Sequence, residues 1–124
     1  MRPNETLLIF EEQIQEVIKA LRGGTIRMAS NCVEPWNPLR PGKEITLDEK
    51  GENVLPDREV GISLAASLSH LQMIWRKGRE NYLFIVDRDT YLEEGFEFHK
   101  QSNHHWMIVV NRKMKKAEYL KKCN

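Results

Sequence analysis

Four prolines between residues 31 and 60 constrain the fold of this chain more than any other feature. They are Pro35, Pro38, Pro41 and Pro56. Proline has no backbone N–H to donate, so a segment with four of them is neither a long helix nor a central strand. An irregular stretch of this length in a small domain is usually a functional loop or a mobile one. We therefore predict a long Pro-rich loop over residues 31–60, with a brief strand at 45–47 and a turn at 48–51 inside it.

The segment before this loop has the pattern of an amphipathic helix. Apolar residues recur at three- and four-residue steps from Leu7 to Leu21. Asn4 is suited to cap the N-terminus of such a helix, and Gly23 stops the pattern. We predict an N-terminal amphipathic helix over residues 1–23. Its apolar stripe would pack against the core or fill a groove on a partner.

Four segments after residue 23 are typical of strands, because they alternate in hydropathy or are rich in β-branched and aromatic residues. They are residues 25–30, 82–86, 96–99 and 105–110. A second helix is predicted to begin at Ser63, which would cap it, with apolar residues from Leu64 to Trp75 on its buried face. A basic helix or tail over 111–124 closes the chain. This order predicts a single α+β domain over 1–124 with a mostly antiparallel sheet.

Composition narrows the class of protein further. Hydrophobic residues make up 40% of the 124 and charged residues 30%, so we expect a globular chain. Its apolar runs are far shorter than the ~20 residues that span a bilayer, and no signal-peptide pattern stands at the start. Cys32 and Cys123 lack zinc-ligand spacing. We expect two reduced thiols in a cytoplasmic protein, with a single disulfide as the alternative.

Positive charge is concentrated at the C-terminal end of the chain. Residues 111–124 carry six lysines and arginines against Glu118, a net charge of +5, whereas the whole chain carries only +1. So small a total argues against a strongly basic nucleic-acid binder. The basic tail would attract a phosphate backbone, or it is a solvated closing helix.

Three histidines, His99, His104 and His105, flank a turn at residues 100–103. Imidazoles that reach a common point bind a metal ion or move a proton near neutral pH. Adjacent residues of a strand point to opposite faces, so His104 and His105 would not both ligate one ion. We therefore assign no metal site. The alternative interpretation is an exposed polar hairpin loop.

Tyr119 and Lys122 form a Tyr-x-x-Lys arrangement shortly after these histidines. Together they resemble rolling-circle replication initiators, in which paired histidines bind a divalent ion beside a tyrosine nucleophile. The resemblance implies metal-dependent nicking of single-stranded DNA by Tyr119. Those enzymes carry His-apolar-His, whereas this chain reads His104-His105-Trp106.

A second resemblance covers residues 24–110. Arg27 and Ser30 stand in the first predicted strand, and Ser63 and Ser67 stand where a strand leads into a helix. This order resembles small ADP-ribosyltransferase-like domains. In that family a first-strand arginine anchors nicotinamide adenine dinucleotide (NAD), and the serine motif supports the nicotinamide ribose. The resemblance implies NAD contacts for all four residues. An edge strand with Arg27 in solvent is the alternative.

The third motif of that family is a glutamate on a late strand, where this chain offers His104 and His105. The third motif therefore does not match, and we expect these histidines to do acid–base work, in transfer or in a related phosphate-removing or cyclising chemistry. The alternatives are that Glu97, one strand earlier, replaces the glutamate or that catalysis has been lost. Trp36, between two prolines of the loop, would cover the ligand or pin the loop to the core. The loop over 31–60 would then act as a lid.

Three functions follow as expectations. The first is an ADP-ribosyltransferase-like protein, such as a toxin or effector, that binds NAD or an ADP-ribose ligand and transfers ADP-ribose to a protein or nucleic acid. The second is a non-enzymatic binding or inhibitor protein of phage or bacterial origin that uses the loop and the basic tail. The third is metal-dependent DNA nicking through the histidines and Tyr119.

Overall fold

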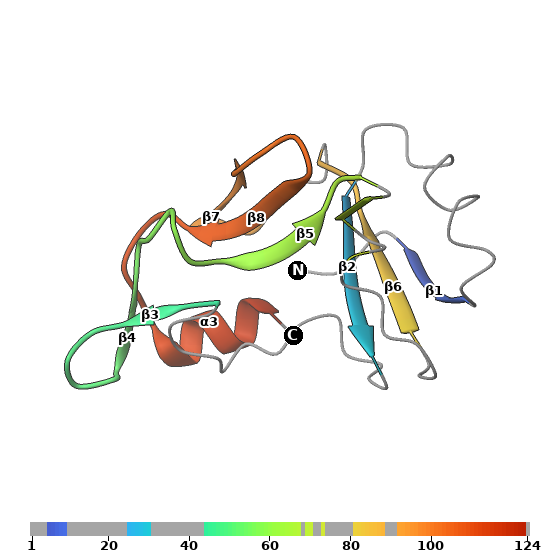
Figure 1. The fold of residues 1–124 in the computed structure, drawn as a ribbon. Helices are drawn as coiled ribbons and strands as arrows, with labels where there is room; N and C mark the ends of the chain where they lie inside the picture. Colours follow the sequence, from blue (N-terminus) through green and yellow to red (C-terminus); the bar gives the residue numbers. More distant parts are fainter. Residues whose placement is uncertain are drawn as a thin grey trace.

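A computed structural model describes residues 5–9, 25–30, 44–67, 69–70, 73, 81–88 and 92–123, with the first two ranges and 81–83 described through their backbone alone. Within these residues, six strands form one sheet in which every neighbouring pair is antiparallel (Figure 1). Their order across the sheet is β1–β6–β2–β5–β8–β7. The strands are β1 (Glu5–Ile9), β2 (Thr25–Ser30), β5 (Ile62–Ala65), β6 (Asn81–Val86), β7 (Phe96–Lys100) and β8 (His105–Val110).

A smaller antiparallel sheet of three strands and the helix α3 lie beside the larger sheet (Figure 1). The elements are β3 (Thr46–Leu47), β4 (Asn53–Leu55), β9 (Met114–Lys115) and α3 (Lys116–Cys123). The turn between β3 and β4 is held by Asp48, whose carboxylate accepts hydrogen bonds from Nδ2 of Asn53 at 2.7 Å and from the N–H of Glu52 at 3.0 Å. The Asn53 side chain is the main cause that lowers the pKa of Asp48.

The hydrophobic core lies between one face of the larger sheet and the layer made by α3 and the small sheet. Ile62 and Leu64 of β5 and Ile108 of β8 belong to that face, because alternate residues of a strand share a side. They cluster with Val54 of β4 and with Tyr119 of α3. All five side chains are at most 2% exposed. Burying apolar surface of this kind is the main force that stabilises the fold.

The prediction of a helix at the start of the chain is wrong for residues 5–9. Glu5–Ile9 is strand β1, which pairs with β6 from Glu5 opposite Ile85 to Ile9 opposite Asn81. Leu7, Leu8 and Ile9 are consecutive apolar residues, and a short run of this kind fits a strand as well as a helix. A pairing partner more than seventy residues away decides between the two. The rest of the predicted helix, residues 10–23, lies outside the described residues.

The prediction that Ser63 caps a helix is also wrong. Ser63 lies inside strand β5, where it pairs with Met107 of β8. The helical backbone begins later, with Ser69, His70 and Met73 among the described residues. A polar residue inside a short strand has the same sequence signature as a cap, and hydrogen bonding to a neighbouring strand decides its structure.

Most of the other predicted elements are confirmed. Strands occur at 25–30, 81–86, 96–100 and 105–110, a brief strand and turn occur at 46–51, and a helix closes the described chain. The prediction that residues 31–60 contain no central strand is wrong for 53–55, because β4 lies between β3 and β9 in the small sheet. β2 lies between β6 and β5, so the alternative that Arg27 stands in an edge strand is wrong. No helix among the described residues is long and apolar enough to cross a bilayer. The described chain is mostly antiparallel β-sheet with one short C-terminal helix.

Candidate functional site

Three neighbouring strands, β2, β5 and β8, meet at one level of the larger sheet. Ala65, the last residue of β5, pairs with Ile26 on one side and with His105 on the other. The N–H of Ala66 then donates to the carbonyl of His104 at 2.9 Å, which extends the pairing one step beyond the strands. The backbone therefore brings the residues that follow β5 next to those that precede β8.

Ser67 and His104 are in direct contact at this end of the sheet. Oγ of Ser67 lies 2.9 Å from Nδ1 of His104. The same oxygen accepts the N–H of His70 at 3.2 Å, which is the N-cap interaction that starts a helix, and it lies 3.2 Å from Oγ of Ser69. Ser67, and not Ser63 as predicted, therefore caps this helix. Its hydroxyl also joins that helix to the β7–β8 hairpin.

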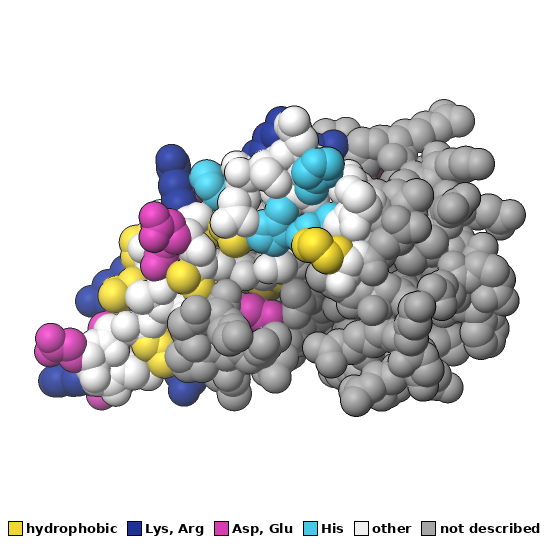
Figure 2. Space-filling view, in the orientation of Figure 1, with side chains coloured by type: hydrophobic (Ala, Val, Ile, Leu, Met, Phe, Trp, Pro, Cys, Tyr) yellow, Lys and Arg dark blue, Asp and Glu magenta, His cyan; other side chains and the backbone are white. Residues whose placement is uncertain are grey.

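A second contact between the same two segments joins His70 and His105. Their ring centroids lie 5.3 Å apart with 29° between the ring planes. Nδ1 of His105 also contacts Oε1 of Gln101 in the hairpin turn. Partial burial, and secondarily the nearby His70, lower the pKa of His105. Figure 2 shows histidine side chains gathered on this face of the molecule.

The hairpin turn itself is closed by backbone hydrogen bonds. The N–H groups of Gln101 and Ser102 each donate to the carbonyl of His105 at 3.0 Å. Residues 101–104 are exposed, as the hairpin-loop interpretation expects. His99 pairs with Met107, two residues along from His105, and it takes no part in the contacts described above. Among the described residues, no three His, Cys, Asp or Glu side chains are grouped to hold a metal ion.

The residues predicted to bind NAD are therefore only partly brought together. Ser67 contacts His104. Arg27 directly follows Ile26, the residue of β2 that pairs with Ala65. Ser30 pairs with Asn81 at the far end of β2. At about 3.3 Å per residue, its backbone is about 13 Å from that of Ile26.

Two predicted NAD-binding residues remain, Ser63 and Trp36. Ser63 is exposed, and it pairs with Met107, two residues along β8 from His105. Since alternate residues share a side of the sheet, Ser63 and Ala65 lie on the same side. Trp36 lies outside the described residues, so its predicted role as a cover stays a prediction.

Tyr119 does not support the DNA-nicking interpretation. Its side chain is 1% exposed and lies in the core, with its ring centroid 5.7 Å from that of Phe96. A nucleophile must touch the phosphate that it attacks, and this phenol cannot do so without separation of α3 from the sheet. Cys123, on the same helix, is a buried thiol, and burial raises its pKa to about 11.

Part of the basic tail holds α3 in place. Nη1 of Arg112 lies 3.1 Å from Oε2 of Glu118, and Nζ of Lys122 donates to the carbonyl of Glu94 at 2.7 Å. The exposed cations of this segment are Lys113, Lys115 and Lys121. The tail is thus both a closing helix, as predicted, and a source of exposed positive charge.

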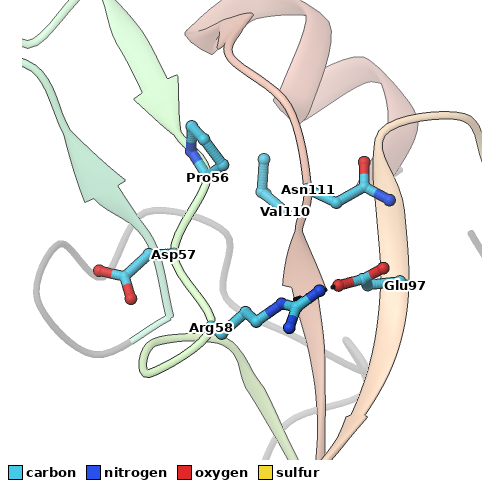
Figure 3. Close-up of a pocket in the computed structure, with 6 residues that line it drawn as sticks. All are labelled: Pro56, Asp57, Arg58, Glu97, Val110 and Asn111. Carbon is cyan, nitrogen blue, oxygen red and sulfur yellow. Dashed lines mark ion pairs between the residues drawn. The ribbon is translucent and has the colours of Figure 1, made fainter.

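A separate open pocket of about 520 Å³ lies near the other end of β8, beside Val110 (Figure 3). Its residues are Pro56, Asp57, Arg58, Glu97, Val110 and Asn111. Nε of Arg58 lies 3.5 Å from Oε1 of Glu97 across it, but the Arg58 side chain is 75% exposed. Such exposed pairs contribute little to stability or binding. Backbone and side-chain hydrogen bonds from Glu59 and Thr46 lower the pKa of Asp57, which is thereby tied to the loop.

The sequence pattern does not predict a role for His70 or the contact between Arg88 and Trp106. His70 stands three residues after Ser67, which is the spacing of an N-cap and its N–H donor, so a correct helix start would have pointed to it. The guanidinium carbon of Arg88 lies 4.4 Å from the Trp106 ring centroid. No sequence signal pairs these two residues, because the contact depends on the sheet.

The lowered pKa of His105 predicts a pH-dependent stability. In the unfolded chain His105 titrates near its ordinary value of 6.5, whereas in the folded chain it titrates lower. Below pH 6.5 the unfolded state therefore binds more protons, and the free energy of unfolding falls as the pH drops. We expect the unfolding midpoint of His105→Gln to fall less than that of the wild type between pH 7.5 and pH 5.5. Equal falls in the two proteins would contradict this, and His99→Gln is the matched control.

The site is thus a Ser67–His104 pair beside stacked His70 and His105, on a sheet of antiparallel strands. An imidazole beside a hydroxyl is suited to proton transfer. Comparison with protein-family models, with curated proteins and with solved structures finds no match for this chain.

Proposed function

We propose that the chain binds NAD or a related ADP-ribose ligand at the shared end of β2, β5 and β8, as an ADP-ribosyltransferase-like domain. One observation carries the proposal: Ala65 pairs with residues of both β2 and β8. The resemblance needs its three motifs to converge on one site. The segments that carry Arg27, Ser67 and His104 are neighbours in this sheet.

Each residue has a role that its chemistry suits. Arg27 would hold a phosphate of the dinucleotide, since a guanidinium offers donors in a fixed fork. Ser67 would hydrogen-bond to the nicotinamide ribose. Transfer breaks the bond between that ribose and nicotinamide, and the attacking group must lose a proton. His104 would accept this proton, because the chain has histidines where the family has a glutamate.

Two other segments of the chain supply the remaining parts of the proposal. The loop that carries Trp36 would close over the bound nucleotide and exclude water. An acidic acceptor, a protein or a nucleic acid, would be attracted by the exposed Lys113, Lys115 and Lys121.

Thermal unfolding with NAD tests this function. A ligand at about 1 mM with a dissociation constant near 0.1 mM adds roughly 1.4 kcal/mol to the free energy of unfolding. In a domain of this size, that raises the midpoint by several degrees. We expect this rise in the wild type and in the matched variant His99→Gln, and a smaller rise in His104→Gln. Arg27→Ala is expected to lose the rise while its midpoint without ligand is kept.

Two outcomes would contradict the proposal. No rise with NAD or with ADP-ribose in the wild type would favour the non-enzymatic binding protein. A rise with manganese and none with the nucleotides would point to the histidines as metal ligands.

A further inference from the structure

We propose that Ser67 is itself an acceptor of the ADP-ribosyl group, with His104 as its general base. This inference rests on the proposed function and adds a site of covalent modification to it. The contact that carries it is the 2.9 Å distance between Oγ of Ser67 and Nδ1 of His104.

The proposal assigns the hydroxyl proton of Ser67 to Nδ1 of His104. Oγ accepts the N–H of His70, so one lone pair is occupied and the hydroxyl proton is free to be donated elsewhere. Its possible acceptors are Nδ1 of His104 at 2.9 Å and Oγ of Ser69 at 3.2 Å. A neutral imidazole nitrogen is the better acceptor, and it is also the nearer one. In this arrangement Nε2 of His104 carries the ring proton.

The surroundings of Ser67 also favour loss of its hydroxyl proton during the reaction. His104 is exposed and Ser67 is half-buried, so a nucleotide in solvent reaches both. As the proton leaves, negative charge develops on Oγ, where the N–H of His70 already donates. A fixed donor aimed at developing charge lowers the barrier of such a step.

The step balances as a simple displacement. Oγ of Ser67 bonds to C1 of the nicotinamide ribose, and the bond between that carbon and the ring nitrogen of nicotinamide breaks. The electron pair of the broken bond returns to the pyridinium ring, which leaves as neutral nicotinamide. The hydroxyl proton passes to Nδ1 of His104 and then to water. The products are an O-ADP-ribosyl serine and nicotinamide.

Intact-mass and peptide mass spectrometry of the full chain after incubation with NAD tests the inference, with released nicotinamide measured alongside. We expect a single ADP-ribosyl adduct on Ser67. Ser67→Asn keeps a helix cap but has no hydroxyl, so it is expected to stay folded and unmodified. Removal of a general base slows such steps by about 100-fold or more, so His104→Gln is expected to form the adduct that much more slowly. Ser69→Ala and His99→Gln are the matched controls, and they are expected to react like the wild type.

The possible negative results distinguish a failure of this inference from a failure of the proposed function. A wild-type chain that is stabilised by NAD but gains no adduct overturns Ser67 as an acceptor and leaves nucleotide binding in place. An adduct that forms equally in Ser67→Asn places the acceptor elsewhere and also overturns the inference. No stabilisation by NAD, and no adduct, overturns the inference and the proposed function together.

Discussion

Replacing Tyr119 by alanine is expected to lower the free energy of unfolding by about 3–5 kcal/mol, the usual cost of deleting a buried aromatic ring. The side chain is 1% exposed, and its ring packs against Phe96 of β7. Tyr119 and Cys123 are the buried residues through which α3 packs on the core. A domain of this size is stable by about 5–15 kcal/mol, so the variant would lose much of its margin. Urea denaturation measures the loss as a lower midpoint at an unchanged slope.

Tyr119→Phe is the matched control. It keeps the ring and removes only the hydroxyl, so its loss is expected to be about 1 kcal/mol or less. A loss from Tyr119→Ala as small as that from Tyr119→Phe would mean that α3 does not cover the core as described. Because a core residue is needed for folding, loss of any activity in Tyr119→Ala would not by itself identify a nucleophile.

Elements with strong local signals were predictable from the sequence. His105–Val110 is a run of aromatic, β-branched and apolar residues, and it forms β8 over the predicted residues. The turn at 48–51 was predicted from its residue types. Asp48 accepts the hydrogen bonds there, and Gly51 adopts a φ of +70° that favours glycine. In these segments the preference of the local sequence agrees with the folded structure. Their structure could therefore be predicted without knowledge of a distant pairing partner.

Elements whose structure depends on a distant partner were not predictable. Leu7 to Ile9 fit the periodicity of a helix, yet they form β1 against β6. Ser63 was interpreted as a cap, yet it lies in a strand between two others. The strands β4 and β9 contain three and two residues, which is too short for a periodic pattern. In each case hydrogen bonding across the sheet overrides local propensity.

The candidate site was also predictable only in part. Ser67 and His104 were both selected as site residues from the sequence, but their contact joins residues 37 apart and depends on the pairing of β5 with β8. His70 was missed because the helix start was placed four residues too early. The resemblance groups Ser30 with Arg27 in one motif, yet Ser30 pairs with Asn81 at the far end of β2. A sequence gives the chemistry of such a site, and the sheet register decides which of its residues meet.

The other large effect is expected from Gly61→Val, at the start of the strand that leads to Ser67. A Cβ at Gly61 would lie 2.6 Å from the main-chain oxygen of Ile108 and 2.8 Å from Cγ1 of Val109. Backbone in a paired strand cannot move aside as a flexible side chain does. Overpacking of this kind costs about 1–3 kcal/mol, and a branched side chain against backbone falls at the upper end. We therefore expect a loss of about 3 kcal/mol in the free energy of unfolding.

Gly51→Ala is the matched control for Gly61→Val, because its expected cost comes from the backbone conformation and not from a steric clash. No atom lies within 4 Å of a Cβ at Gly51, but its φ of +70° disfavours any other residue, at a cost of about 1 kcal/mol. Urea denaturation of both variants compares the two costs. Amide hydrogen exchange should show the loss of protection in Gly61→Val concentrated in β5 and β8. If Gly61→Val costs no more than Gly51→Ala, β5 does not approach β8 as closely as described. The contact between Ser67 and His104 depends on that approach, so it would then lose its support as well.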